Sequence, residues 1–211
     1  MLARALTQVV PLAAAGGSPW VHAWWYLGRS SGLTAFWLLF ASVAMGLAVG
    51  SRVFDGMLAR PWVFEVHKFL SIFVLLAMIF HALIMIPDPY AKFTFQQMLV
   101  PFQAHSRTNA IALGIVTLYA SVFITATFYM KSVIGQNGWR IIHYATFAIF
   151  VMALAHGLWA GTDTKKAYVQ YAYLAASAAV LFLTFFRILA TRSASKRTPR
   201  LTSVPSSSKA A

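Results

Sequence analysis

Four histidines of this chain lie inside hydrophobic segments, in two pairs of nearly equal spacing. His67 and His81 bound the stretch HKFLSIFVLLAMIFH, and His143 and His156 bound HYATFAIFVMALAH. An ionisable side chain is costly to place in an apolar segment and therefore indicates a functional site. Neutral imidazole is a ligand well suited to iron. The repeated pattern predicts a metal-binding or proton-carrying site built from two helices.

The composition predicts the class of protein that holds these histidines. The chain has 211 residues, of which 60% are hydrophobic and 10% charged. A soluble domain of this length would carry a far more charged surface. Five apolar segments are each long enough to cross a hydrocarbon core of ~30 Å as a helix. They occupy residues 30–50, 62–86, 109–130, 139–160 and 168–190. We therefore expect an all-α fold, an integral membrane bundle of about five transmembrane helices.

The basic residues predict the topology. The net charge is +13, and the Ser/Thr/Pro-rich residues 191–211 hold several of the cations. This segment has too little apolar surface to fold, so we expect a basic, disordered tail. Cytoplasmic flanks of membrane helices carry excess Lys and Arg, which places the C-terminus inside and the N-terminus outside. The charge is thus a topology signal, and we expect no nucleic-acid partner.

Residues 1–24 are expected to form an N-terminal interfacial segment. Their apolar run VVPLAAA is short and is broken by Pro11, so we do not expect cleavage as a signal peptide.

The chain contains no cysteine, no G-x-G-x-x-G motif and no Walker motif. These absences exclude thiolate metal sites and covalently attached c-type haem. No segment outside the helices is long enough for a nucleotide-binding βαβ unit. We expect no flavin or NAD(P)H site in this chain, so electrons for any redox reaction must come from another molecule.

The histidine spacing predicts two sites at two depths. At 1.5 Å per residue, the fourteen residues from His67 to His81 span about 21 Å, and the thirteen from His143 to His156 about 20 Å. The two helices run in the same direction in the expected topology, so His67 lies level with His143 and His81 with His156. Two facing imidazole pairs are what two stacked haems need. A haem with two histidine ligands has no open iron position and is suited to electron transfer.

The helical phase does not fit this arrangement fully. At 100° per residue, fourteen residues return to within about 40° of the same face, whereas thirteen miss it by about 140°. An ideal straight helix could not direct His143 and His156 to one side. A local change in winding or a side-chain movement is required.

The histidines also fit two roles that involve no haem. Each histidine alone could be a structural residue that bonds a neighbouring helix. Together they could line a pathway for protons or a metal ion. Such a pathway normally recruits carboxylates within the helices, and only Glu65 lies near one.

The chain resembles the ferric reductase-like transmembrane domain family, which includes NADPH oxidases, ferric-chelate reductases and the haem subunit of the periplasmic methionine-sulfoxide reductase system. The resemblance rests on the two histidine spacings, fourteen and thirteen, and on the stretches YLGRSSGLTAFWLL (26–39), WRIIHYATF (139–147) and HGLWAGTD (156–163). It covers residues 25–190, which we take as a haem domain.

The resemblance implies two non-covalent b-type haems, with His67 and His143 as ligands of the inner haem and His81 and His156 as ligands of the outer one. Arg29 matches an arginine that the family places near the outer haem, and its alternative role is an interfacial anchor. Positive residues near the inner haem could meet its propionates or could be topology signals only. These are Arg52, Arg60, Lys68 and Arg140.

Two departures from the family limit what the resemblance implies. The oxidases have a further histidine one turn beyond the outer ligand of the first histidine helix, where this chain has Met85. Oxygen reduction is therefore not implied. The family's flavin and nicotinamide domains are absent, so the donor is a cytoplasmic flavin reductase or a quinol. Residues 92–109, with His105 and Arg107, could cap the outer haem, bind an acceptor or form an ordinary interfacial loop.

Together these inferences predict an oxidoreductase's electron-transfer subunit in the bacterial plasma membrane. Electrons would pass from the cytoplasmic donor to a ferric chelate, to oxygen or to a periplasmic redox enzyme outside. The alternative function is a histidine-lined transporter or channel for a metal ion or protons.

Overall fold

The computed structural model of this chain describes residues 19–51, 59–89 and 91–197. Within them lie seven helices: α1 (Pro19–Ser51), α2 (Arg60–Ile84), α3 (Phe95–Leu99), α4 (Thr108–Tyr129), α5 (Lys131–His143), α6 (Thr146–Ala160) and α7 (Ala167–Arg197). No strand occurs in this part of the chain. The predicted all-α fold is confirmed.

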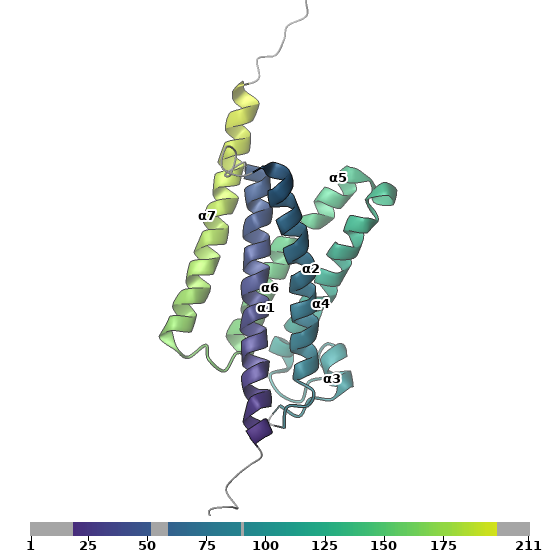
Figure 1. Cartoon of the computed structure of the whole chain (residues 1–211), viewed down its shortest axis with the longest axis vertical. Coiled ribbons are helices and arrows are strands. Elements are labelled where there is room, and N and C mark those ends of the chain that lie inside the picture. The colour runs from purple at the N-terminus through teal and green to yellow at the C-terminus, as the bar shows by residue number, and fades with distance from the viewer. Residues whose placement is uncertain (1–18, 52–58, 90, 198–211) are drawn as a thin grey trace, which may run out of the picture.

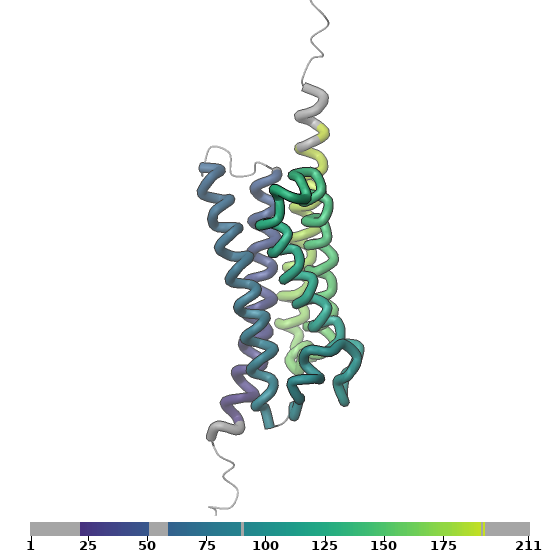
Figure 2. Tube along the Cα trace, turned by 90° about the vertical axis from the view of Figure 1, so that its right-hand side faces the viewer, coloured from purple at the N-terminus to yellow at the C-terminus, as the bar shows by residue number. Residues whose placement is uncertain are grey.

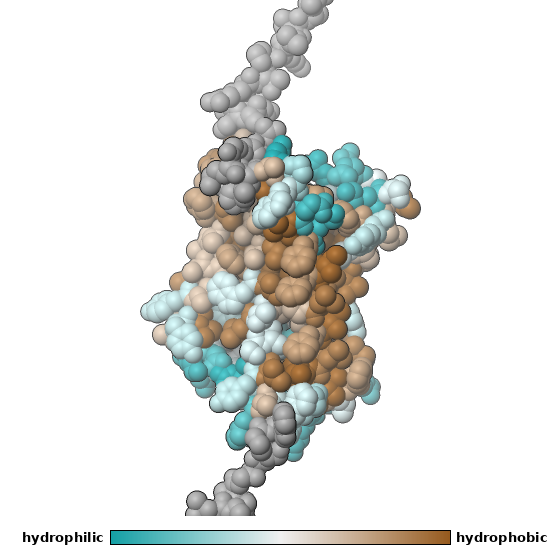
Figure 3. Space-filling model, viewed as in Figure 1, coloured by the Kyte–Doolittle hydropathy of each residue, from teal (hydrophilic) through white to brown (hydrophobic). Residues whose placement is uncertain are grey.

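The long helices have the length and composition of membrane spans. α1, α2, α4 and α7 are each long and apolar enough to cross a membrane, and α5 with α6 can form a fifth, bent span. Large apolar side chains point outward along α2, where Phe69 is 65% exposed and Leu76 is 56% exposed. Figure 3 shows the resulting hydrophobic surface between two more polar ends. The chain is a multi-pass membrane protein, because such a surface is stable only against lipid.

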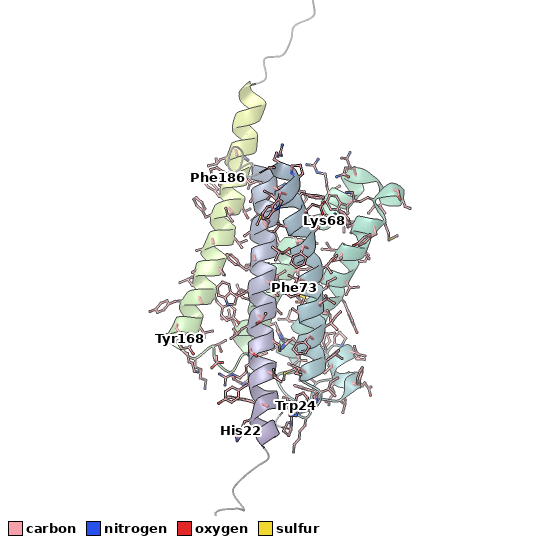
Figure 4. All side chains as sticks on the ribbon, in the orientation of Figure 1. His22, Trp24, Lys68, Phe73, Tyr168 and Phe186 are labelled. Carbon is pink, nitrogen blue, oxygen red and sulfur yellow. The ribbon has the colours of Figure 1, made fainter. Side chains whose placement is uncertain are left out.

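The helices cross the bundle in alternating directions (Figures 1 and 2). α1 and α2 pack side by side, α4 packs on α6, and α7 packs on α1. α2 and α6 run in the same direction, from the upper end of Figure 1 to the lower end. We call the end near His67 the His67 end and the opposite one the His81 end. Figure 4 shows Lys68 near the His67 end, Trp24 near the His81 end and Phe73 between them on α2.

Two boundaries differ from those expected. α1 begins at Pro19, so residues 19–24 are helical and continue into the first span instead of forming a separate segment. Proline suits the first helical position because its missing N–H needs no partner there. α7 continues to Arg197, so residues 191–197 are helical and not part of a disordered tail. No Gly or Pro interrupts residues 191–197, and the Ala, Arg and Lys residues among them favour helix. The rest of both expected segments, 1–18 and 198–211, lies outside the described residues.

The expected span 139–160 is not one continuous helix. α5 ends at His143 and α6 begins at Thr146, with a bend of 43° between them. At the break the backbone hydrogen bonds tighten, with the Ala145 N–H bonded to the Ile142 carbonyl at 3.0 Å. α5 itself is interrupted at Gly135, whose φ of 74° is a conformation that glycine adopts readily. Gly138 also lies inside α5.

The core lies where α1 meets α6 and α7. Phe36 of α1 is 6% exposed, and its ring centroid lies 5.7 Å from that of Phe150 and 4.6 Å from that of Tyr173. Ala176 of α7 is 2% exposed, and a small residue there lets the helix backbones approach. This packing fixes α6 against α1.

We expect Phe36→Ala to destabilise the bundle and Trp37→Ala to have little effect. Trp37 follows Phe36 directly but is 39% exposed. Because lipid is as apolar as the core, exposing an apolar side chain to lipid costs little. The loss of stability in Phe36→Ala therefore comes mainly from the cavity that the phenyl ring leaves, and it lowers the free energy of unfolding by roughly 2 kcal/mol. Thermal unfolding in detergent measures the difference. An equal loss of stability in both variants would contradict the described packing.

Candidate functional site

Four histidines, on α2, α5 and α6, form two facing pairs. The ring centroids of His67 (α2) and His143 (α5) lie 6.1 Å apart. Those of His81 (α2) and His156 (α6) lie 6.3 Å apart. The planes of each pair are steeply inclined, by 85° and 72° respectively. The pairing expected from the spacing is confirmed.

Both separations fit two imidazoles on opposite sides of one metal ion. A metal–imidazole bond is about 2 Å long, and a ring nitrogen lies about 1 Å from its ring centroid. Two such ligands therefore have centroids about 6 Å apart. Two histidines that were neighbours without a shared metal ion could instead stack their rings or hydrogen-bond to each other directly. The two pairs share this spacing although they lie on different parts of the bundle.

The break between α5 and α6 reduces the mismatch in helical phase. A 3₁₀ turn advances about 120° per residue and an α-helix about 100°. The tightened hydrogen bonds at Tyr144 and Ala145 add rotation in the direction that the thirteen-residue spacing lacks. The 43° bend changes the direction of α6 as well. The expected change in winding is thus present at this break, and His143 and His156 both lie beside histidines of α2.

Three of the four imidazoles have the same ring nitrogen engaged. Nδ1 of His67 lies 2.9 Å from the Ser42 carbonyl oxygen, and Nδ1 of His156 lies 2.7 Å from that of Ala110. A carbonyl can only accept, so both Nδ1 atoms carry the hydrogen.

His81 reaches the same state through a hydroxyl. The Ser31 Oγ lies 3.1 Å from Nδ1 of His81 and donates its hydrogen to the Gly28 carbonyl at 3.0 Å. Ser31 is thus an acceptor from His81. In all three neutral rings the Nε2 lone pair remains available, as a metal ligand requires.

His143 is held differently. Its Nδ1 is buried and has no hydrogen-bond partner among the described residues, and the same holds for Nε1 of Trp139 one turn earlier. The Trp139 ring lies against the His143 ring, with centroids 4.9 Å apart and planes inclined by 31°. Lys131 covers Trp139, its Nζ 4.5 Å from the ring centroid. Ring contacts, not a hydrogen bond, orient this imidazole.

Each histidine pair lines a cavity of about 610 Å³. One is bounded by α1, α2, α4, α5, α6 and α7 around His67 and His143. The other is bounded by α1, α2, α4, α6, α7 and the segment between α2 and α4, around His81 and His156. Both volumes fall within the range of about 300–1,000 Å³ that is typical of small-molecule and cofactor sites.

The cavity at the His67 end is lined by cations. Their side chains come from α2, α5 and α7: Arg60, Lys68, Arg140 and Arg187. Lys68 is also paired with Glu65, with Nζ–Oε2 at 2.9 Å. Arg187 lies so close to Gly50 of α1 that a Cβ there would come within 2.6 Å of its guanidinium carbon. Arg60, Lys68 and Arg140 thus lie at the end of the bundle where they were expected, and Arg52 lies outside the described residues.

The cavity at the His81 end includes Arg29. Arg29 lies within α1, ten residues after its first residue, Pro19. Its Nε donates to Asp163 Oδ2 at 2.7 Å, and its guanidinium lies 3.9 Å from the centroid of the Trp25 ring. Asp163 also pairs with Lys166 at 2.8 Å. Arg29 thus joins α1 to the α6–α7 connection beside the cavity.

The segment between α2 and α4 packs at the His81 end (Figure 2). It contains α3, which Thr94 and Gln97 begin with a capping box. His105 and Arg107 line the cavity, and Arg107 donates to the Ala160 carbonyl at the end of α6. Met85 lines it too. The segment therefore lies against this cavity, and its expected role in acceptor binding stays a prediction.

Sequence reasoning missed the groups that orient the histidines and Arg29. Ser31 and Trp139, which contact His81 and His143, and Asp163, which pairs with Arg29, stand in quoted stretches but gained a role only from the structure. One signal was present: Gly32 and Gly46 are fourteen residues apart, the same spacing as His67 and His81.

Comparison with protein-family models, with curated proteins and with solved structures finds no match to this chain.

We expect Asp163→Asn to lower the stability of the protein more than Lys166→Gln does. The first change leaves the partly buried Arg29 without its charged partner, at a cost of about 1.5–3 kcal/mol. Lys166 is 53% exposed, and an exposed ion pair contributes about 0–1 kcal/mol. Thermal unfolding at low and high salt measures both. Equal effects, or loss of the Asp163→Asn effect in high salt, would show that the Arg29–Asp163 pair is only a surface interaction.

Proposed function

We propose that this protein carries electrons across a membrane by means of two non-covalent b-type haems. His67 and His143 would hold one haem, and His81 and His156 the other. Each bound haem supplies an iron that accepts and releases one electron. The chain's own contribution is to fix the axial ligands, to enclose the macrocycle and to present two sites along α2 and the α5–α6 pair.

The observation that carries the proposal is the pair of imidazole separations, 6.1 and 6.3 Å. Structural histidines have no reason to face one another twice at the distance that a shared metal ion sets. Three rings also have Nδ1–H bonded and Nε2 available. This is the state in which imidazole binds a metal.

Two imidazoles per site favour haem over a free metal ion. A tetrahedral zinc site takes three or four protein ligands, and a haem iron needs only axial ones. Among the described residues no group of three or more His, Cys, Asp or Glu side chains is suited to hold a metal ion. The arrangement supports the haem proposal better than the metal-ion pathway.

We further propose that the chain belongs with the ferric reductase-like transmembrane proteins. The two histidine spacings and the pairing of the four rings support this membership. We propose that it serves as an oxidoreductase's electron-transfer subunit, supplied by a cytoplasmic flavin reductase or a quinol. The acceptor on the other side would be a ferric chelate, oxygen or a periplasmic redox enzyme.

The distribution of charge supports an orientation in a bacterial inner membrane. The His67 end carries Arg60, Lys68, Lys131, Arg140, Arg187 and Arg192 with the acidic Glu65. The His81 end carries fewer cations and two acidic residues, Asp88 and Asp163. By the excess of Lys and Arg on cytoplasmic flanks, the His67 end faces the cytoplasm.

Electron transfer into sealed liposomes tests the function. The haem-loaded protein is reconstituted into liposomes that contain ferricyanide, and reduced flavin mononucleotide is supplied outside as the donor. We expect the wild type to reduce the trapped ferricyanide. His81→Ala removes a ligand, and we expect its rate to fall at least roughly tenfold.

His22→Ala is the matched control, because His22 is an exposed histidine near the start of α1. It should retain the wild-type rate. Ferricyanide reduction that is equally fast with His81→Ala, or absent with the haem-loaded wild type, would contradict the proposal. Proton or metal-ion flux in the same liposomes without electron transfer would favour the ion pathway.

A further inference from the structure

Three glycines lie directly against three of the paired histidines. A Cβ placed on Gly46 would lie 3.0 Å from Cε1 of His67, and one on Gly32 would lie 2.9 Å from Cε1 of His81. On α4, a Cβ on Gly114 would lie 2.7 Å from Nδ1 of His156. Non-bonded carbon atoms prefer about 3.5–4.0 Å. No side chain larger than hydrogen fits at these positions without moving the ring.

Each glycine stands four residues after the carbonyl that serves the same histidine. Ser42 accepts from His67 and precedes Gly46, and Ala110 accepts from His156 and precedes Gly114. The same relation holds at His81, where the Ser31 hydroxyl passes the bond to the carbonyl of Gly28, four residues before Gly32. Three histidines, which face α1 or α4, therefore share one arrangement of a carbonyl and a glycine four residues later.

The geometry of the α-helix explains the four-residue offset. The carbonyl of residue i already accepts from the N–H of residue i+4, but its oxygen has a second lone pair. The side chain of residue i+4 points towards the helix N-terminus and covers the surface over that carbonyl. Glycine at i+4 uncovers the oxygen, so that an imidazole from another helix can donate to it.

We propose that Gly32, Gly46 and Gly114 are positioning residues that fix the tautomer and the direction of His81, His67 and His156. This inference rests on the proposed function, because it assigns the free Nε2 of each ring to a haem iron. α1 and α4, which supply no ligand, thereby act as templates for ligands on α2 and α6. His143 lacks this arrangement and is oriented by Trp139 instead.

Single Gly→Ala variants test the proposal with a glycine control outside both cavities. Gly32→Ala should displace His81 and lower haem occupancy at that site only, and Gly46→Ala should do the same at the His67 site. Gly138→Ala is the control, since a Cβ on this residue of α5 would meet no atom within 4 Å. Haem per chain and the redox titration of each haem are measured.

Serine variants separate hydrogen bonding from steric bulk. Ser31→Ala removes the acceptor of His81 without adding an atom to the site, so folding is not at risk from a clash. Loss of such an outer partner typically weakens metal binding by about 10–100-fold, and we expect this loss at the His81 site. Ser30→Ala is the control, because the Ser30 hydroxyl donates to the Leu27 carbonyl of its own helix at 3.3 Å and not to a histidine of the described residues.

Histidine ¹⁵N NMR of the haem-free protein gives a readout that does not depend on haem. We expect Nδ1–H in His67, His81 and His156 of the wild type, and loss of that hydrogen-bonded signal for His67 alone in Gly46→Ala. Unchanged spectra and haem occupancy in the glycine variants, or an equal effect of Gly138→Ala, would overturn the inference. A wild type that binds no haem but shows the three Nδ1–H signals, lost as expected, would refute only the proposed function.

Discussion

The structure depends on one constraint: an imidazole inside a membrane-spanning bundle needs a partner for each of its two ring nitrogens. Lipid hydrocarbon offers no hydrogen-bond partner for these nitrogens, and bulk water does not reach them. An unpaired polar group in such an environment is costly. His67, His81 and His156 place Nδ1 against serine or carbonyl oxygens of a neighbouring helix. Their Nε2 atoms remain available, and under the proposed function they would hold the haem irons.

This constraint divides the work among the helices. α2 and the α5–α6 pair carry the imidazoles, whereas α1 and α4 supply acceptor oxygens and glycine surfaces that orient them. α7 closes the bundle through the packing of Tyr173 on Phe36. At the His81 end the Arg29–Asp163 pair ties the connection after α6 to α1. Apolar side chains form the outer surface, because this surface contacts lipid.

Much of the fold was predictable because membrane helices have a strong compositional signal. The lengths of the apolar segments located the spans, and the nearly equal spacings of the two histidine pairs predicted which rings would face each other. Neither feature could locate the break at Tyr144 and Ala145, which contains no Pro or Gly and arises from tertiary packing. The partners of Arg29 and His81 were also not predictable, because Asp163 and Ser31 come from other parts of the chain and only the packed bundle brings them together.

The most direct test of the central claim is the haem content of the purified wild-type protein, expressed with ample haem supply. Haem per chain is quantified, and a dithionite-reduced minus oxidised optical spectrum identifies its type. The two imidazole pairs predict two b-type haems per chain. A protein that contains no haem under these conditions would contradict the account, and the histidine pairs would then require another ligand.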